Sequence, residues 1–291
     1  MNILSYSELP EKIIEKAKSL GASIAGIASV ESLKNSPSHQ IYPIIGMNLK
    51  KHFENVKDSE TIDEVAWPVD ALSVVIIGVE HNIKEPELDL WDGRGTPGNR
   101  VLVRINRQLS EWMETTFSIK TYKLPYFVEK GGIFLKDAAV MAGLGCVGKN
   151  NLVITPEYGP RVRFRALLMD YEVKVTGPIE YNPCEDCDQP CRNFCPINAF
   201  QNTVYSHDKV GQSILPGING TYDRVTCNMK MEKDIEDAVM KAPILDDEKK
   251  EIWSAINEFE EGIKVPLKND FKSNYSVKYC RICELTCPAG K

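Results

Sequence analysis

Cysteines are the residues with the clearest chemistry in this sequence, and eight of the nine lie after residue 180. Seven of the eight form two compact runs, CEDCDQPCRNFCP and CRICELTCP, and one stands alone between the runs. The eight are Cys184, Cys187, Cys191, Cys195, Cys227, Cys280, Cys283 and Cys287. The first residues show no basic start followed by an apolar run, so a secretory disulfide framework is not expected and metal binding is the better interpretation.

The spacing within the runs is typical of [4Fe–4S] clusters. A cubane cluster needs four converging thiolates, and one tight loop supplies three of them. In two-cluster ferredoxins the cysteine before the proline binds the other cluster. On that rule the first cluster is expected at Cys184, Cys187, Cys191 and Cys287. The second cluster is expected at Cys195, Cys227, Cys280 and Cys283.

Two structural zinc sites are the alternative, because zinc also accepts C-x-x-C pairs. One departure from the ferredoxin pattern concerns the first run, where three residues, Asp188 to Pro190, precede Cys191 instead of two. This spacing could alter the geometry or potential of one cluster. Since clusters in a soluble chain mostly carry electrons, the rest of the chain should hold what receives them.

The segments before residue 175 have the pattern of an α/β domain. Periodicity predicts helices at 7–20, 99–117 and 133–142 and strands at 22–28, 71–79 and 161–170. The composition then changes, which predicts a first domain over 1–175 and a second over 176–291, with an acidic helical insertion at 228–279. The net charge of -6 favours neither DNA nor a membrane surface as a partner. A cytoplasmic location is expected.

The stretch GLGCVGKN, Gly143 to Asn150, matches the letters of a dinucleotide-binding fingerprint. That fingerprint works only between a strand and a helix. Here a helical run precedes it, and Pro156 and Pro160 prevent a helix after it. We therefore expect Gly143 to end a helix, and the glycines to let the backbone approach a large flat cofactor closely.

The segment AGLGCVGKNNLVITPEYGPRVRFRALLMD and the cysteine layout resemble the epoxyqueuosine reductase family, which is related to the reductive dehalogenases. The resemblance covers nearly the whole chain. It implies an α+β chain in which a nitroreductase-like α/β cobalamin-binding domain is followed by a ferredoxin-like domain with two [4Fe–4S] clusters. It also implies an oxidoreductase in which electrons pass through both clusters to the corrinoid.

The resemblance further implies that segment 142–165 lines the corrinoid. The residues expected there are Gly143, Gly145, Cys146, Gly148, Lys149, Asn150, Tyr158 and Arg163. The expected proton donor is Glu129, where the family has Asp, and Tyr126 is a weaker candidate. The alternative for Glu129 is a surface carboxylate paired with Lys130. The alternatives for Cys146 are a small core residue and a lower corrinoid ligand.

The resemblance also implies reduced ferredoxin or flavodoxin as the electron donor. The substrate is expected to be epoxyqueuosine in tRNA or a small molecule. Two departures weaken the tRNA expectation: the sequence is acidic, and it stops at Lys291, whereas family members that act on tRNA often continue into a further helical region. The alternative function is that of an electron-transfer or corrinoid-reducing partner protein without substrate chemistry of its own.

Overall fold

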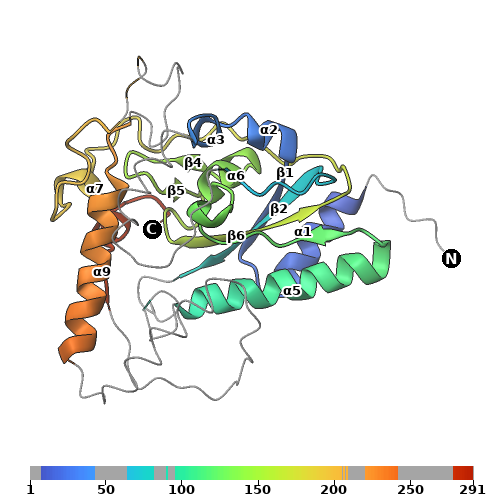
Figure 1. The fold of residues 1–291 in the computed structure, drawn as a ribbon. Helices are drawn as coiled ribbons and strands as arrows, with labels where there is room; N and C mark the ends of the chain where they lie inside the picture. The colour runs from blue at the N-terminus through green and yellow to red at the C-terminus, as the bar shows by residue number, and fades with distance from the viewer. Residues whose placement is uncertain are drawn as a thin grey trace.

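A four-stranded antiparallel sheet with the strand order β1-β2-β6-β3 lies at the centre of the protein (Figure 1). The computed structural model describes residues 8–42, 64–81, 90, 96–204, 206, 208, 220–241 and 278–290, with the backbone alone for residues 129 and 239–241. The strands are β1 (Ile24–Ser29), β2 (Ser73–Glu80), β3 (Thr121–Tyr122) and β6 (Val162–Met169). All the strands predicted from the sequence are therefore present, each within two residues of its predicted start.

Strand β2 is the core of this sheet, as its continuous apolar run predicts. It pairs with β1 on one side and β6 on the other, so Ile76 lies opposite both Gly26 and Ala166. All its residues from Ser73 to Val79 are buried. A strand that is covered on both faces has no polar alternation, because neither face meets water.

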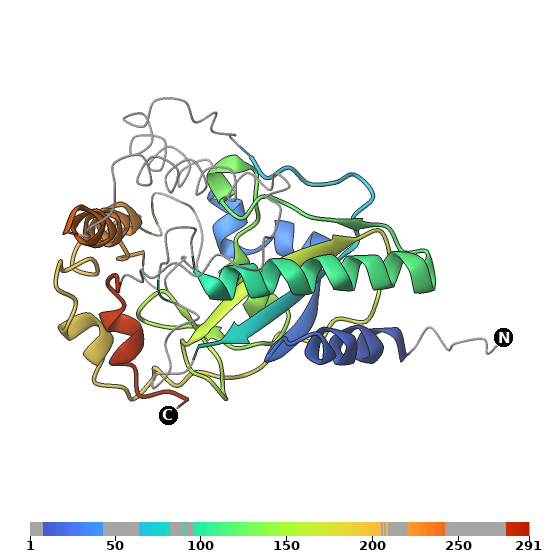
Figure 2. The ribbon, with the colours of Figure 1, turned by 90° about the horizontal axis from the view of Figure 1, so that it is seen from below.

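Helices cover both faces of the sheet (Figures 1 and 2). One face carries α1 (Leu9–Ser19) and α5 (Pro97–Phe117), and the other carries α2 (Val30–Lys34) and α6 (Leu135–Met141). Ile77 belongs to the core with α1 and α5, whereas the adjacent Ile76 belongs to the core with α2 and α6. Adjacent residues of a strand point to opposite faces, so β2 joins both cores into three layers.

The elements that carry cysteines lie beyond one end of the sheet (Figures 1 and 2). They are α7 (Pro190–Asn193), α9 (Arg224–Lys241) and α11 (Ile282–Leu285), of which α7 and α11 are in contact. The predicted acidic insertion begins inside α9, and its residues 242–277 lie outside the described part of the chain. The domain boundary near residue 175 stays a prediction. No described helix combines the length and the apolar character that crossing a membrane requires.

A buried polar cluster joins the corner after α2 to the start of α6. Asp137 is only 8% exposed, and it accepts hydrogen bonds from the Ser36 hydroxyl (2.7 Å), the Ser38 amide (2.8 Å) and the Ser38 hydroxyl (2.7 Å). His39 Nδ1 lies 2.8 Å from Ser36 Oγ, and His39 Nε2 accepts from the Phe134 amide at 3.2 Å. Because Nε2 is an acceptor, the proton of the neutral ring is on Nδ1.

We expect the stability of the protein to fall as the pH is lowered from about 7.5 to about 5.5, in part because His39 stays neutral. Burial lowers the pKa of His39 from 6.5 to about 4, and the charge of Asp137 offsets only part of this effect. The unfolded chain therefore binds a proton near pH 6.5 that the folded chain binds only near pH 4. Stability that is present above pH 6.5 is thus lost as the pH falls, by about 1 kcal/mol over this interval.

Anaerobic urea unfolding of the wild type and of His39→Gln at the two pH values measures this effect. The difference in the free energy of unfolding between them should shrink by about 1 kcal/mol at the lower pH. Gln40→Ala changes an exposed neighbour that does not titrate, so its effect should be the same at both pH values. A His39→Gln difference that does not change with pH would contradict the prediction.

Candidate functional site

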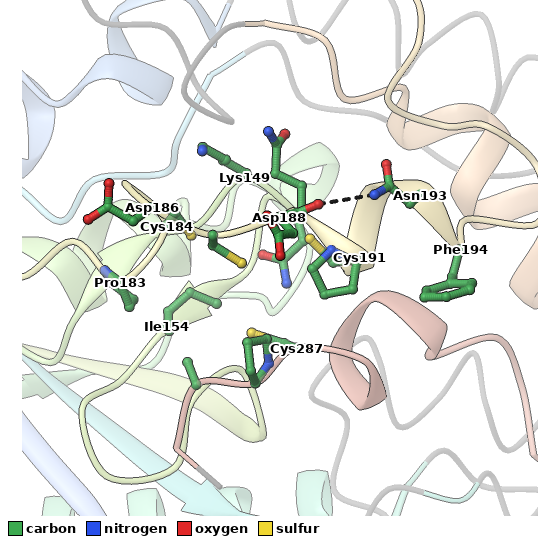
Figure 3. Close-up of a pocket in the computed structure, with 16 residues that line it drawn as sticks. Lys149, Ile154, Pro183, Cys184, Asp186, Asp188, Cys191, Asn193, Phe194 and Cys287 are labelled. Atoms are coloured by element: carbon green, nitrogen blue, oxygen red, sulfur yellow. Dashed lines mark hydrogen bonds between the residues drawn. The ribbon is translucent and has the colours of Figure 1, made fainter.

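A cavity of about 710 Å³ lies between the first cysteine run and the end of the second. Four cysteines line it, namely Cys184, Cys187, Cys191 and Cys287. Figure 3 shows the side chains of Cys184, Cys191 and Cys287 around this space, although Cys287 is far from the others in sequence. These are the four cysteines that the ferredoxin rule assigns to one cluster. That they bind a cluster stays a prediction.

The thiols around this cavity oppose one another's ionisation. Burial raises the pKa of Cys191 to about 11, and the charges of Cys287, Cys184 and Cys187 contribute to the rise. Burial also raises the pKa of Cys287, and the charges of Cys184 and Cys187 act in the same direction. Four thiolates at such close range need a cation among them, and coordination to a metal deprotonates a thiol outright. The donor set therefore fits an iron–sulfur cluster.

The other four cysteines form a second group. Burial raises the pKa of Cys283 to about 12, and the charges of Cys227 and Cys280 add to this. Burial raises the pKa of Cys227 too, with contributions from Cys280 and Cys195. Cys283 also interacts with Cys191 of the first group, so the two groups adjoin. Their proximity suits electron transfer from one to the other.

The arrangement of the thiols bears on the zinc alternative. A zinc ion with four bonds of about 2.3 Å would draw its sulfur ligands to within about 4 Å of one another. The first group surrounds a cavity of about 710 Å³, which a multinuclear cluster would fill. The choice between a cluster and zinc stays a prediction.

The first cysteine run accommodates its extra residue in a short turn. Gln189 has a φ of 58°, in the left-handed region, and the helix α7 begins at Pro190 immediately after it. The Asn193 side-chain amide donates to the Asp188 carbonyl at 3.0 Å, which closes the turn (Figure 3). The longer spacing before Cys191 therefore forms a defined turn that still directs this thiol into the cavity.

A buried ionic cluster ties the second cysteine run to the sheet. His81 is 3% exposed directly after β2, and its Nδ1 lies 3.1 Å from Glu284 Oε1 and 2.8 Å from Arg281 Nη2. Arg281 Nε donates to Glu284 Oε2 at 3.0 Å. Burial alone would raise the pKa of Glu284, but the hydrogen bonds from His81 and Arg281 outweigh it and lower this pKa. Sequence spacing gave no sign that His81 contacts this run.

The glycine stretch follows a helix and contains the first strand of a short hairpin, which confirms that it lacks the preceding strand and following helix of a dinucleotide-binding loop. Helix α6 precedes it, and β4 (Cys146–Val147) within it pairs with β5 (Val153–Ile154) after it. Gly143 has a φ of +73°, and its amide donates to the Val140 carbonyl at 2.9 Å, so it ends the helix as predicted.

At two of these glycines a side chain would collide with the protein itself, whereas the expected reason for a glycine was the approach of a flat cofactor. A Cβ on Gly143 would lie 2.8 Å from the Thr176 carbonyl oxygen, and a Cβ on Gly145 would lie 2.1 Å from that of Ile154. The close approach is therefore to the protein's own backbone, and no flat cofactor is needed to explain either residue. A Cβ on Gly148 would likewise meet the side chain of Ile154, at 2.6 Å.

Three other residues that were expected at the corrinoid lie beside the cysteines. Lys149 and Asn150 line the cavity, and Asn150 donates its side-chain amide to the Cys283 carbonyl at 3.3 Å. The pKa of Cys146 is raised to about 11 by burial and by the charges of Cys184 and Cys287. The glycine stretch thus contacts the cysteine-bearing elements. Whether it also contacts a corrinoid stays a prediction.

The remaining predicted residues are on β6, on the turn before it and around the 3₁₀ helix η3 (Val128–Lys130). Arg163 donates to the Tyr279 hydroxyl, and Tyr158 is partly buried against the core. The Tyr126 ring centre lies 5.7 Å from the Arg165 guanidinium. Glu129 is the middle residue of η3, and its side chain lies outside the described part of the structure. Its role, and its pairing with Lys130, stay predictions.

A row of polar atoms at the start of α5 and along it has no signal in the sequence pattern. The Thr96 hydroxyl, directly before α5, and the side-chain carbonyl oxygens of Asn99 and Asn106 are buried and have no hydrogen-bond partner in the described structure. They are three and seven residues apart, so they lie on one side of the helix. Asn106 donates its amide to the Ala166 carbonyl of β6 at 2.7 Å, which places this row beside β6. Buried acceptors of this kind call for a donor.

Known proteins match this chain in sequence over part of its length, although no protein-family model matches it. An epoxyqueuosine reductase of Lactococcus garvieae is 30% identical over 158 residues, which cover 51% of this chain and 44% of the relative. A tetrachloroethene reductive dehalogenase of Desulfitobacterium hafniense is 31% identical over 107 residues, or 33% of this chain and 18% of the relative. The chain thus spans about half the length of the curated epoxyqueuosine reductases that it matches.

Solved structures match the fold of almost the whole chain. A solved epoxyqueuosine reductase from Bacillus subtilis, with its catalytic aspartate loop swung out of the active site, matches with a TM-score of 0.54 at 19% identity. The match covers 99% of this chain and 66% of the other. By sequence and by fold, therefore, this chain is similar to epoxyqueuosine reductases and to reductive dehalogenases, which confirms the resemblance predicted from the glycine segment and the cysteine layout.

Proposed function

We propose that the protein is a reductase that uses two [4Fe–4S] clusters and a corrinoid to reduce epoxyqueuosine in tRNA or an unidentified small molecule. The observation that carries this proposal is the grouping of the eight cysteines. Each group of four combines cysteines from both runs, as in two-cluster ferredoxins. When bound, the clusters would carry single electrons, and the corrinoid would supply a strongly reducing cobalt centre.

The chain's own residues hold the cysteine loops against the sheet. Asn150 joins the glycine stretch to the Cys283 loop, and Glu284 joins this loop to the end of β2 through His81. Arg161, which directly precedes β6, donates to the Ala289 carbonyl at 3.0 Å. These contacts fix the distance between the electron-carrying groups and the sheet, which a transfer path requires. Cys191 and Cys287 are buried residues, and their exposed side-chain surface faces the cavity.

The row of acceptors on α5 supports a corrinoid beside β6. Asn99 and Asn106 offer two amide oxygens that need donors, and Thr96 offers a hydroxyl without a partner. The rim of a corrinoid carries amide side chains, whose N–H groups are suitable donors. These residues, together with Arg163 on the neighbouring strand, would hold the rim of the cofactor. Reduced ferredoxin or flavodoxin is the proposed electron donor.

Glu129 is the proposed proton donor. Removal of an epoxide oxygen as water consumes a pair of electrons and a pair of protons, so a general acid is needed near the substrate. The solved relative has a catalytic aspartate loop, and Glu129 stands where we expect that aspartate. A glutamate keeps the carboxyl group and extends it by one methylene.

The decisive experiment combines spectroscopy with turnover. Anaerobically purified, iron-reconstituted protein is mixed with cobalamin, a low-potential reductant and either epoxyqueuosine-containing tRNA or the free nucleoside. We expect absorption bands of iron–sulfur clusters, a base-off corrinoid spectrum and formation of queuosine detected by mass spectrometry. Clusters with corrinoid uptake but no turnover of either substrate would favour a corrinoid-reducing partner. Clusters without corrinoid uptake would leave only an electron carrier.

A further inference from the structure

Lys136 belongs to α6, which packs on the sheet, but its side chain faces the second cysteine group. Its Nζ atom lies 5.3 Å from the centre of the Tyr222 ring. Burial lowers the pKa of Lys136 to about 8, Arg224 lowers it further, and the charges of Cys227 and Cys283 oppose both effects. The ammonium group of Lys136 is therefore within electrostatic range of two thiols of the second group, and it comes from a different part of the fold.

Tyr222 holds this cation in place and contacts the same thiols. Its hydroxyl makes a side-chain hydrogen bond with Cys227. The centre of its ring lies 5.6 Å from that of the Phe200 ring. The guanidinium of Arg192, the residue after Cys191 of the first group, lies 5.4 Å from the centre of the Phe200 ring. The Arg192 side chain also donates to the Phe200 carbonyl at 3.2 Å. Tyr222 is thus next to Phe200, to Cys227 and to the Lys136 ammonium group.

Among the described residues, the first cysteine group has more carboxylates around it than the second group. Its cavity is lined by the exposed carboxylates of Asp186 and Asp188 as well as by Lys149. Arg161 also acts on Cys287 of the first group. The second group has Lys136 and Arg224 nearby and a hydroxyl bonded to Cys227, and the Glu284 carboxylate beside Cys283 is paired with Arg281. The potentials of iron–sulfur clusters depend on the local charge, the hydrogen bonds to sulfur and the solvent exposure. The local charge and the hydrogen bond to sulfur both favour a higher reduction potential for the cluster at the second group.

We propose that Lys136, positioned by Tyr222, raises the reduction potential of the cluster held by Cys195, Cys227, Cys280 and Cys283 above that of the other cluster. This inference rests on the proposed function, because it requires both clusters to be bound. Reduction by a one-electron donor protein adds one unit of negative charge and no proton to each site. A fixed cation and a hydrogen-bond donor stabilise that added charge, so electrons pass from the first group to the second, next to α6.

Redox titration of the holoprotein at pH 7, followed by electron paramagnetic resonance, tests this inference. Lys136→Met keeps the length of the side chain and removes its charge. This variant should lower one midpoint potential by at least about 59 mV, which is a tenfold change in the equilibrium constant for one-electron reduction. The other midpoint potential should stay unchanged. Lys136→Arg should restore the wild-type value. Tyr222→Phe, which keeps the ring but not the hydroxyl, should lower the same potential.

Lys149→Met is the matched control, because Lys149 lines the cavity of the first group. It should shift only the other midpoint potential. Two unchanged potentials in Lys136→Met with full iron content would overturn the inference, and so would equal shifts of both. If Lys136→Met does not retain its iron, Lys136→Gln takes its place, and two unchanged potentials in that variant would overturn the inference instead. Wild-type protein that binds no clusters would contradict the proposed function itself.

Discussion

Cys287→Ala is expected to lose one of two [4Fe–4S] clusters, so that the iron content falls from roughly eight to roughly four atoms per chain. The reason is that Cys287 shares a cavity with three cysteines of the first run, although it belongs to the second. Cys191→Ala should therefore abolish the same paramagnetic signal as Cys287→Ala. Iron analysis and electron paramagnetic resonance of the reduced, anaerobically reconstituted variants measure both effects.

The neighbours of these cysteines give the sharper comparison. Cys195 is on the same run as Cys191, and Cys283 is on the same run as Cys287, yet both belong to the second group. Cys195→Ala and Cys283→Ala should abolish the other signal. Cys146→Ala should keep both signals, because Cys146 is the ninth cysteine and completes neither group of four. If Cys191→Ala and Cys195→Ala abolished the same signal, the crossed arrangement would be wrong. The same holds for Cys283→Ala and Cys287→Ala.

The sequence predicts the elements whose pattern is local. Strand β2 is a continuous apolar run because both of its faces are covered, and α5 has a clear apolar stripe because only one of its faces is covered. The crossed grouping of the cysteines was also accessible, because the proline after Cys195 and after Cys287 marks the cysteine that leaves its own loop. In each of these cases the physical cause acts within a short stretch of chain.

Other features of the site depend on residues that are far apart in the sequence. Lys136 lies beside Cys227, and His81 lies beside Glu284, and neither pair has any spacing that a sequence pattern could reveal. The glycines show another limit of prediction from the sequence. Gly145 has the letter that a cofactor loop requires, but the atom that excludes a side chain there is the Ile154 carbonyl oxygen. A glycine indicates a close approach without indicating what approaches.

The backbone of the η3 turn, which carries Glu129, is fixed by hydrogen bonds, and the second large effect concerns this residue. The Tyr42 hydroxyl donates to the Val128 carbonyl at 2.9 Å, and the Gly132 amide donates to the Phe127 carbonyl at 2.9 Å. A Cβ on Gly132 would lie 2.3 Å from the Pro125 carbonyl oxygen, so the turn is tight. The first bond attaches the turn to Tyr42, and the second closes the turn on itself around position 129.

Glu129→Gln is therefore expected to lower the rate of substrate reduction by about 10²- to 10⁴-fold, the usual contribution of a general acid. Glutamine keeps the size of the side chain but cannot give up a proton, so iron content and corrinoid binding should stay unchanged. Glu129→Asp should retain much of the activity, and Tyr126→Phe should lose less than Glu129→Gln. Single-turnover assays with prereduced protein measure the chemical step apart from electron delivery. Full activity in Glu129→Gln would assign the proton to another group, and a large loss in Tyr126→Phe would then identify Tyr126 as that group.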